Sequence, residues 1–369
     1  MIMKTCLKRS SESSVLNRTD RLITMIRRQS SVGYPRIIPS LSSSVVPHTR
    51  RRFSRPYSTT GTTTQDSSNL NSNSNSDSSR TTHFGFEEVP VDEKQDRVLG
   101  VFQNVAEHYD VMNDLMSGGL HRLWKDELLT MTGVAPMAAA LRRANTTTNT
   151  TPVQSSSSTS GRLLSILDVA GGTGDVAFRF LEAAKCPERA LSSGNDEISI
   201  TVCDINPHML DVGRRRARNR YGDAVLDTSH SLRFVEGNAQ ELLAFEEGAF
   251  DLYTIAFGLR NVTDVDRALT EAYRVLKPGG RYLCLEFSKV EDPYLAGIYD
   301  AYSFHVIPTV GDIVANDRDS YRYLVESIRK FSNQGELKKK MEDAGFVGCK
   351  YTNMTGGIVA IHEGWKPLE

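Results

Sequence analysis

The residues best suited to chemistry follow apolar runs, at points where buried strands are expected to end. The first group is an acid and a glycine-rich stretch, Asp168 and Gly171-Gly172-Thr173-Gly174. Glycines at this spacing let a backbone approach a nucleotide or another adenosine-containing ligand closely. Polar groups also follow the later apolar runs: Asp204, Asn238-Ala239, Arg260-Asn261 and Glu286.

One ligand class that fits the glycine-rich stretch is a nicotinamide dinucleotide. Gly172-x-Gly174-x-x-Ala177 matches the dinucleotide fingerprint, which accepts alanine at its third position. The ribose-binding acid of that fingerprint follows after about 20 residues, whereas Asp204 lies 30 residues beyond Gly174. An insertion at 186–197 would account for the longer spacing, so this alternative stays open.

The other ligand class is S-adenosylmethionine, which carries a sulfonium, a carboxylate, an ammonium and an adenosine, but no phosphate. The glycine-rich stretch, with Thr173, would then lie close to the methionine part. Asp204 would accept hydrogen bonds from both ribose hydroxyls. Asn238 would bond to the adenine edge, and the small side chain of Ala239 would allow the base to come close.

The elements that position these residues alternate between strand and helix from Leu163 onward. This alternation predicts βαβ units and a doubly wound, mostly parallel α/β sheet, in which ligands bind beyond the carboxyl ends of the strands. The last two strands, joined through Gly356-Gly357, are expected to form an antiparallel hairpin at the edge. The seven expected strands are 163–170, 198–205, 232–239, 250–258, 281–288, 348–355 and 357–366.

Residues 1–58 are rich in Arg and Ser, and Glu12 and Asp20 are their only acids. This composition is typical of an organellar transit peptide, which we interpret as mitochondrial. Polar low-complexity sequence follows, so 59–97 is expected to be a disordered linker.

A single domain is expected at 98–369. Apolar residues at helical spacing between 98 and 132 predict two helices ahead of the sheet. A second polar low-complexity stretch, at 145–161, is interpreted as an insertion in a surface loop of this domain.

Charge is distributed unevenly along the 369 residues. Residues 1–60 contain 12 Lys or Arg and two acids, whereas residues 61–369 contain 32 basic and 43 acidic residues, a net charge of -11. Sequence-independent binding to nucleic acid depends on Lys and Arg contacts to phosphate. The acidic body of the chain therefore argues against a nucleic-acid partner.

Several motifs resemble those of class I methyltransferases, with Asp168-x-x-x-Gly172-x-Gly174 followed by Asp204 and by RVLKPGG at 274–280. Longer stretches are similar to the ubiquinone/menaquinone C-methyltransferase family. The similarity covers nearly everything from about Val98 onward except 145–161. It is carried by YDVMN at 109–113, FGLRNVTD at 257–264, YRVLKPGGRYLCLEFSK at 273–289 and the stretch from YDAYSF to LVESI at 299–328.

The chain departs from the pattern at two positions. Ala170 stands where the methyltransferase series usually has its first glycine. Ala256 stands where family members often have Ser, at a position associated with the cofactor. One hydrogen bond to the cofactor would then be absent, worth about 1 kcal/mol.

The resemblance implies a chemistry and a set of roles. S-adenosylmethionine would methylate a ring carbon of a polyprenyl methoxy-benzoquinol in ubiquinone biosynthesis, without a metal. Arg260 would stabilise phenolate character on the acceptor, Asn261 would orient the quinol oxygen, and Tyr109 would contact the substrate from helices that cover the site. The alternative for Arg260 is an ion pair with a nearby acid that pins its loop.

The resemblance also implies where the protein works and with what. It would act in the mitochondrial matrix, peripherally on the inner membrane, in a complex with other ubiquinone-biosynthesis enzymes, with homodimer formation left open. An apolar route for the tail is expected along Tyr299–Val314. Two other functions stay open, a NAD(P)-dependent oxidoreductase and a scaffold of the biosynthetic complex that has lost turnover.

Overall fold

The structure is a computed structural model that describes residues 81–105, 113–114, 117–148, 163–184, 198–227, 232–309 and 318–369. The expected transit peptide at 1–58 and the first part of the expected linker lie outside the described residues. Tyr109 lies outside them as well.

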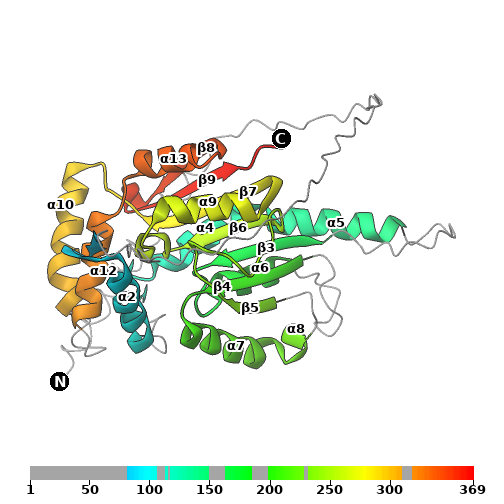
Figure 1. Ribbon diagram of the computed structural model, residues 1–369, viewed down its shortest axis with the longest axis horizontal. Coiled ribbons are helices and arrows are strands. Elements are labelled where there is room, and N and C mark those ends of the chain that lie inside the picture. Colours follow the sequence, from blue (N-terminus) through cyan, green and yellow to red (C-terminus); the bar gives the residue numbers. More distant parts are fainter. Residues whose placement is uncertain are drawn as a thin grey trace, which may run out of the picture. The chain divides into compact units, whose positions relative to one another are not determined.

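A seven-stranded sheet forms the centre of the fold (Figure 1). Its strands are β3 (Leu164–Val169), β4 (Ile198–Asp204), β5 (Leu232–Glu236), β6 (Phe250–Ala256), β7 (Leu276–Phe287), β8 (Val347–Met354) and β9 (Val359–Trp365). The strand order is β5-β4-β3-β6-β7-β9-β8. Strands β3 to β7 pair in parallel, and β9 pairs antiparallel with β7 and β8. The predicted doubly wound sheet with an antiparallel hairpin edge is therefore confirmed.

Helices cover both faces of the sheet, as a doubly wound fold requires. One face carries α4 (Leu120–Thr132), α5 (Val134–Thr148), α6 (Asp175–Ala184) and α7 (Pro207–Tyr221). The other face carries α9 (Val265–Val275) and α13 (Gln334–Asp343). The order of the parallel strands reverses at β3, since β4 and β5 follow on one side of it and β6 and β7 on the other. Such a switch point is where ligands bind in these sheets.

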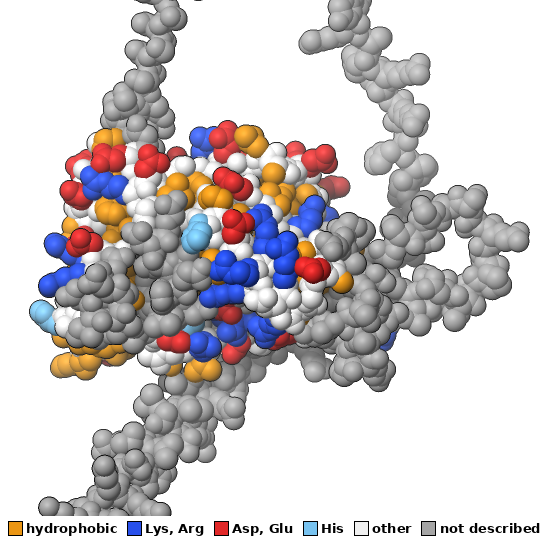
Figure 2. Space-filling model, turned by 90° about the horizontal axis from the view of Figure 1, so that it is seen from below, with side chains coloured by type: hydrophobic (Ala, Val, Ile, Leu, Met, Phe, Trp, Pro, Cys, Tyr) orange, Lys and Arg blue, Asp and Glu red, His pale blue; other side chains and the backbone are white. Residues whose placement is uncertain are grey.

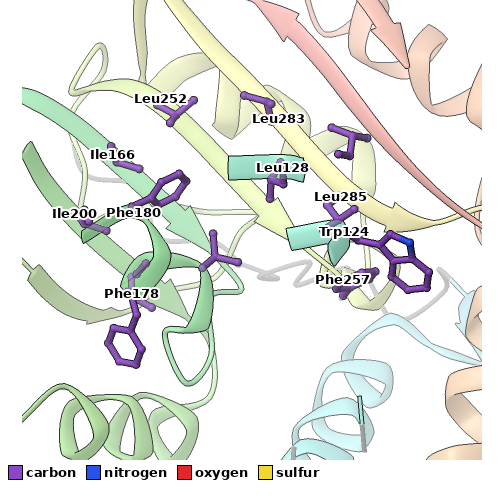
Figure 3. Packing of buried hydrophobic residues seen from close by; sticks show 14 of the residues in the cluster. Trp124, Leu128, Ile166, Phe178, Phe180, Ile200, Leu252, Phe257, Leu283 and Leu285 are labelled. Carbon is purple, nitrogen blue, oxygen red and sulfur yellow. The ribbon is translucent and has the colours of Figure 1, made fainter. Parts of the chain in front are cut away.

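Each face of the sheet has its own hydrophobic core. Successive residues of β3 alternate between them, so that Ile166 belongs to the first core and Leu167 to the second. Figure 3 shows the first core, where Leu128 of α4 and Phe180 of α6 lie against the strands with 0% of their surface exposed. Burial on both faces explains why these strands are continuous apolar runs in the sequence.

The N-terminus of α7 is fixed by local capping. The Asn206 side chain accepts hydrogen bonds from the backbone N–H groups of His208 and Met209, and Pro207 occupies the first helical turn. Because Asn206 lies only two residues beyond Asp204, the last residue of β4, this cap sets where the chain leaves the sheet. It thereby holds the end of β4 at the edge where the polar residues gather.

The exposed side of α7 is rich in arginine. Figure 2 shows Lys and Arg side chains gathered near the middle of this face of the molecule, with acidic side chains among them. Arg214 pairs with Asp211 at 2.7 Å, and Arg218 pairs with Asp223 at 3.3 Å. Acidic side chains therefore pair with some of the arginines of α7, and the basic surface is not continuous.

Residues 81–97 are ordered, which corrects the expected linker at 59–97. β1 (Thr81–Phe84) and β2 (Glu87–Pro90) form a hairpin, and α2 (Val91–Val105) follows directly. The Phe84 ring stacks on Tyr323 of α12 (Arg318–Lys330) at 4.1 Å. A polar segment held by such tertiary contacts has little apolar periodicity of its own, which is why composition suggested disorder.

The expected insertion at 145–161 begins inside a helix. α5 continues to Thr148, and residues 149–161 lie outside the described part of the chain. The two helices predicted between 98 and 132 correspond to α2 and α4, of which α2 begins seven residues earlier than expected, at Val91.

Candidate active site

A cavity with an empty volume of about 1090 Å³ opens at the carboxyl ends of β3, β4 and β6. Gln95, Val98 and Leu99 of α2 line one side of it, so the predicted helical cap covers the site. Its floor is the connection from β3 to α6, which holds the glycine-rich stretch.

The glycine-rich stretch turns sharply and is tied to the end of β4. Gly172 and Gly174 have φ angles of 54° and 84°, in the left-handed region that only glycine adopts without strain. The backbone N–H of Gly172 donates to Oδ2 of Asp204 over 2.9 Å. The predicted neighbours Gly172, Thr173, Gly174 and Asp204 are therefore brought together.

Two residues that are not glycine also adopt positive φ angles at this edge. Ala170, after β3, has φ 51°, and Phe257, after β6, has φ 57°. A methyl group on Gly258 would approach the Ala170 methyl to 2.4 Å, so the two loops are in close contact. Such strain persists where the surrounding structure fixes it and is frequent at functional sites.

The cavity contains buried acids whose pKa values are shifted. Burial raises the pKa of Asp168 to about 7, and burial raises that of Asp204 to about 6. Oδ1 of Asp168 accepts a hydrogen bond from the Thr254 hydroxyl over 2.8 Å. Its Oδ2 is buried and has no partner among the described residues. A donor from a ligand would satisfy this oxygen.

The charges on the cavity wall favour a cationic ligand. Among the described residues that line it, three acids, Asp168, Asp175 and Asp204, face one cation, Lys125. Lys125 already pairs with Asp175 at 2.8 Å. A pyrophosphate would bring two more negative charges to this wall, whereas a sulfonium and an ammonium match it. These residues fit S-adenosylmethionine better than a nicotinamide dinucleotide.

The predicted adenine-binding residues lie at the far side of the same cavity. Asn238 and Ala239 follow β5 and line the wall beside Gln95 of α2. The Asn238 amide donates to Oε1 of Gln95 over 3.4 Å. Ala256, at the end of β6, also lines the cavity, as its predicted role requires.

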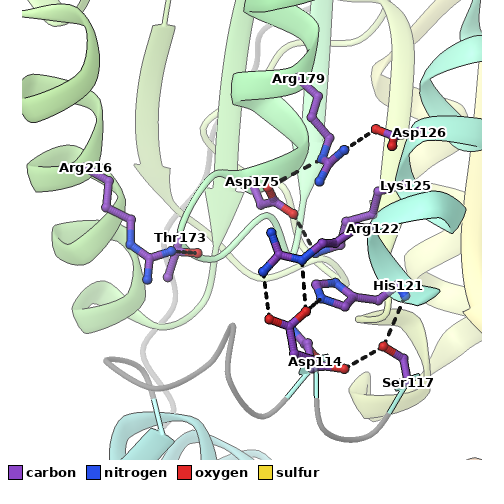
Figure 4. Close-up of polar contacts among 11 residues, drawn as sticks. Asp114, Ser117, His121, Arg122, Lys125, Asp126, Thr173, Asp175, Arg179 and Arg216 are labelled. Carbon is purple, nitrogen blue, oxygen red and sulfur yellow. Dashed lines mark hydrogen bonds and ion pairs between the residues drawn. The ribbon is translucent and has the colours of Figure 1, made fainter. Parts of the chain in front are cut away.

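Thr173 faces α7 and is anchored there. Its hydroxyl accepts a hydrogen bond from Nη1 of Arg216 over 3.1 Å, a contact that Figure 4 shows beside the Lys125–Asp175 pair. The glycine-rich stretch is therefore held from α7 as well as from the end of β4.

Arg260 lies behind the cavity rather than on its wall. Its Nη1 is 2.8 Å from Oε1 of Glu286 and donates to the Phe257 carbonyl over 2.5 Å. Only 3% of the Arg260 side chain and 1% of the Glu286 side chain are exposed. This geometry matches the alternative interpretation of Arg260, in which an ion pair with a nearby acid holds its loop in place. The catalytic role of Arg260 stays a prediction.

Asn261 does line the cavity, and a residue that sequence reasoning missed supports it. Its Oδ1 accepts a hydrogen bond from the hydroxyl of Tyr323 over 3.1 Å. Tyr323 lies within the 299–328 stretch that carries the family resemblance. Lys125 was missed as well, although it lies in the second of the two helices predicted between 98 and 132. Nothing local in the sequence indicates that either side chain reaches the site.

The doubly wound sheet and the acid-lined cavity over the glycine-rich stretch fit a class I, S-adenosylmethionine-dependent methyltransferase. The ubiE/COQ5 methyltransferase family model matches residues 90–366, and the chain belongs to this family.

Individual relatives cover most of this chain. It is 51% identical over 286 residues to the ubiquinone/menaquinone biosynthesis C-methyltransferase UbiE of Methylobacterium nodulans, covering 78% of this chain and 97% of the relative. It is 47% identical to the mitochondrial 2-methoxy-6-polyprenyl-1,4-benzoquinol methylase of Danio rerio, covering 78% and 85%. The protein of that name from Oryza sativa subsp. japonica is 48% identical, with 78% and 89% covered.

Proposed function

We propose that this protein methylates a ring carbon of a polyprenyl methoxy-benzoquinol in mitochondrial ubiquinone biosynthesis. The observation that carries the proposal is the 47–48% identity to relatives named as mitochondrial methylases of this quinol. The sequence of residues 1–58, typical of a transit peptide, supports the same compartment. S-adenosylmethionine supplies an activated methyl group, and the protein must orient the acceptor and adjust its charge.

Asn261 is the described residue best placed to meet the acceptor. Its Oδ1 is held by Tyr323, so its amide N–H groups are left to donate to the quinol oxygen. A quinol carbon becomes a stronger nucleophile as its conjugated hydroxyl loses or shares its proton. Arg260 acts as a positioning residue in this proposal, because its bond to the Phe257 carbonyl fixes the loop that ends in Asn261.

Binding and turnover together test the proposed function. Calorimetric titration of the protein with S-adenosylmethionine should give micromolar affinity, and titration with NADH should give none. The protein should then methylate a short-tailed, reduced methoxy-benzoquinol, with the product identified by mass spectrometry. Binding of NADH alone would favour an oxidoreductase. Cofactor binding without methylation of any quinol would favour the scaffold.

The exposed apolar surface on α10 (Pro293–Ala301) and η3 (Tyr302–Val306) is proposed to contact the matrix face of the inner membrane, where a polyprenyl substrate resides. Tyr294 and Ile298 are 87% and 69% exposed, and Phe304 and Val306 are 41% exposed. Aromatic and aliphatic side chains of this kind anchor proteins at lipid interfaces. None of the helices in the described ranges is both long enough and apolar enough to span a bilayer.

Replacing Tyr294 and Ile298 together with Ser should weaken binding to phospholipid vesicles several-fold in a flotation assay, because apolar area is removed from the contact. Leu243 is 82% exposed outside this surface, so Leu243→Ser is the matched control and should leave binding unchanged. Equal vesicle binding by the double variant and the wild type would rule out this surface.

A further inference from the structure

Lys94 is a buried cation on α2, the helix that covers the cavity. Only 6% of the residue is exposed, and burial lowers the pKa of its ammonium to about 8. Its Nζ donates to the backbone carbonyl of Val262 over 3.1 Å. In the part of the chain that the structure describes, no acid forms an ion pair with it. Burying an ammonium costs free energy, so stability alone explains this lysine poorly.

The contact of Lys94 joins α2 to the loop that follows β6. Val262 lines the cavity and directly follows Asn261, the residue proposed to meet the acceptor. Gln95, the next residue of α2, accepts a hydrogen bond at its Oε1 from the amide of Asn238 after β5, over 3.4 Å. Adjacent side chains of a helix point about 100° apart. Lys94 and Gln95 therefore tie α2 to two different walls of the cavity.

A third side chain, Gln240, joins these two walls directly. Its Oε1 accepts a hydrogen bond from the backbone N–H of Asp264 over 2.7 Å, and its Nε2 is 3.3 Å from Oδ1 of Asn238. Asp264 lies two residues after Val262, so the contacts close into a ring. We refer to this ring as the clasp, formed by Lys94, Gln95, Asn238, Gln240 and the backbone of residues 262–264.

The clasp lies along the cavity wall. Gln95, Asn238, Gln240 and Val262 all line the cavity, whereas Lys94 is adjacent to the wall and acts on it through α2 and Val262. Among the side chains of the clasp, Lys94 alone carries a charge. Hydrogen bonds from a charged donor are stronger than those between neutral groups, so the bond from Lys94 should contribute most to keeping the ring closed.

We propose that Lys94 is a positioning residue, which closes α2 over the cavity and, through Val262, holds Asn261 toward the acceptor. The clasp must open before the cofactor or its demethylated product leaves, so Lys94 sets the rate of their release. The proposal rests on the proposed function only for the identity of the ligand, because the ring of contacts is formed by the protein itself.

Hydrogen exchange of α2 in the protein without ligand is the first test. Lys94→Met removes the cation and keeps the apolar stem. The α2 amides should then exchange about 10-fold faster, the effect of losing one hydrogen bond from a charged donor. Lys94→Arg keeps a cationic donor and should exchange more slowly than Lys94→Met.

Lys366→Met is the matched control. Lys366 is 8% exposed, and its Nζ donates to the carbonyl of Arg274 over 3.4 Å, outside the cavity. This change removes a comparable buried ammonium and should leave exchange in α2 unchanged. Equal acceleration of α2 exchange by both variants would show a general loss of stability and would overturn the proposal.

Release of S-adenosylhomocysteine, measured by stopped-flow displacement, is the second test. Lys94→Met should release it about 10-fold faster than the wild type, and Lys366→Met at the wild-type rate. Lys94→Met/Gln240→Met should release it no faster than the faster single variant, because a ring already broken once gains little from a second break. Unchanged release in Lys94→Met, or additive effects in the double variant, would overturn the proposal. A wild type that binds no S-adenosylhomocysteine would contradict the proposed function, while hydrogen exchange would still decide whether Lys94 holds α2.

Discussion

Arg260→Met should lower the free energy of unfolding by about 3–5 kcal/mol, as measured by urea denaturation, because it removes the charged partner of the buried Glu286 side chain. Glu286 also accepts hydrogen bonds from the backbone N–H groups of Arg260 and Phe287, which remain in the variant. Arg267→Met is the control, since Arg267 and Glu241 pair at 3.3 Å with more than half of each side chain exposed. That change should cost less than about 1 kcal/mol.

The double variant Arg260→Met/Glu286→Gln separates folding from catalysis. Removing both charges should restore most of the lost stability, because no uncompensated charge stays buried. Turnover should nevertheless stay far below wild type while the affinity for S-adenosylmethionine changes little, because the loop that ends in Asn261 has lost its bond from the guanidinium. Recovery of full turnover together with stability would limit Arg260 to a role in folding.

The ion pair of Arg260 illustrates what a single sequence can and cannot reveal. That Arg260 follows a strand end could be inferred from the apolar run before it, because strand runs and the glycine turns between them are local features. Its partner could be inferred as well, because Glu286 follows the next apolar run and could hold Arg260 from that strand end. The two residues are 26 positions apart and pair because β6 and β7 are neighbours in the sheet. The sequence indicated two possible roles for Arg260, stabilising the acceptor or forming an ion pair that holds its loop. The structure shows the ion pair.

Residues missed from the sequence share this dependence on distant contacts. Lys125 meets Asp175 across 50 residues, and Tyr323 meets Asn261 across 62. The hairpin at 81–90 was missed for the same reason, because Phe84 is ordered by Tyr323 rather than by its own neighbours. By contrast, the place of Asp204 at the end of β4 was predicted, because an acid at the end of a buried strand is visible locally. Its role in binding the cofactor stays a prediction.

Asp204 should be the residue whose change most weakens cofactor binding. Its two oxygens accept hydrogen bonds from the N–H groups of Gly172 and Asn206, each over 2.9 Å, which aims the carboxylate at the ribose position. Asp204→Asn removes the charge and one acceptor. Since hydrogen bonds to a charged group contribute about 1.5–3 kcal/mol each, the calorimetric affinity for S-adenosylmethionine should fall about 30-fold or more. Asp211→Asn, at an exposed acid of α7, should leave it unchanged.

The same substitution should have a different effect on the stability of the protein without ligand. Burial raises the pKa of Asp204 from 3.8 to about 6. The folded state then binds a proton that the unfolded state has released, so this contribution is complete below pH 4 and is lost as the pH rises through about 6. Asp204→Asn removes it, and the fall in unfolding free energy between about pH 4 and 7 should be smaller in the variant than in the wild type. Identical pH profiles in urea denaturation would contradict the raised pKa. A flatter profile together with weak cofactor binding would show that Asp204 is kept for its ligand at the expense of stability.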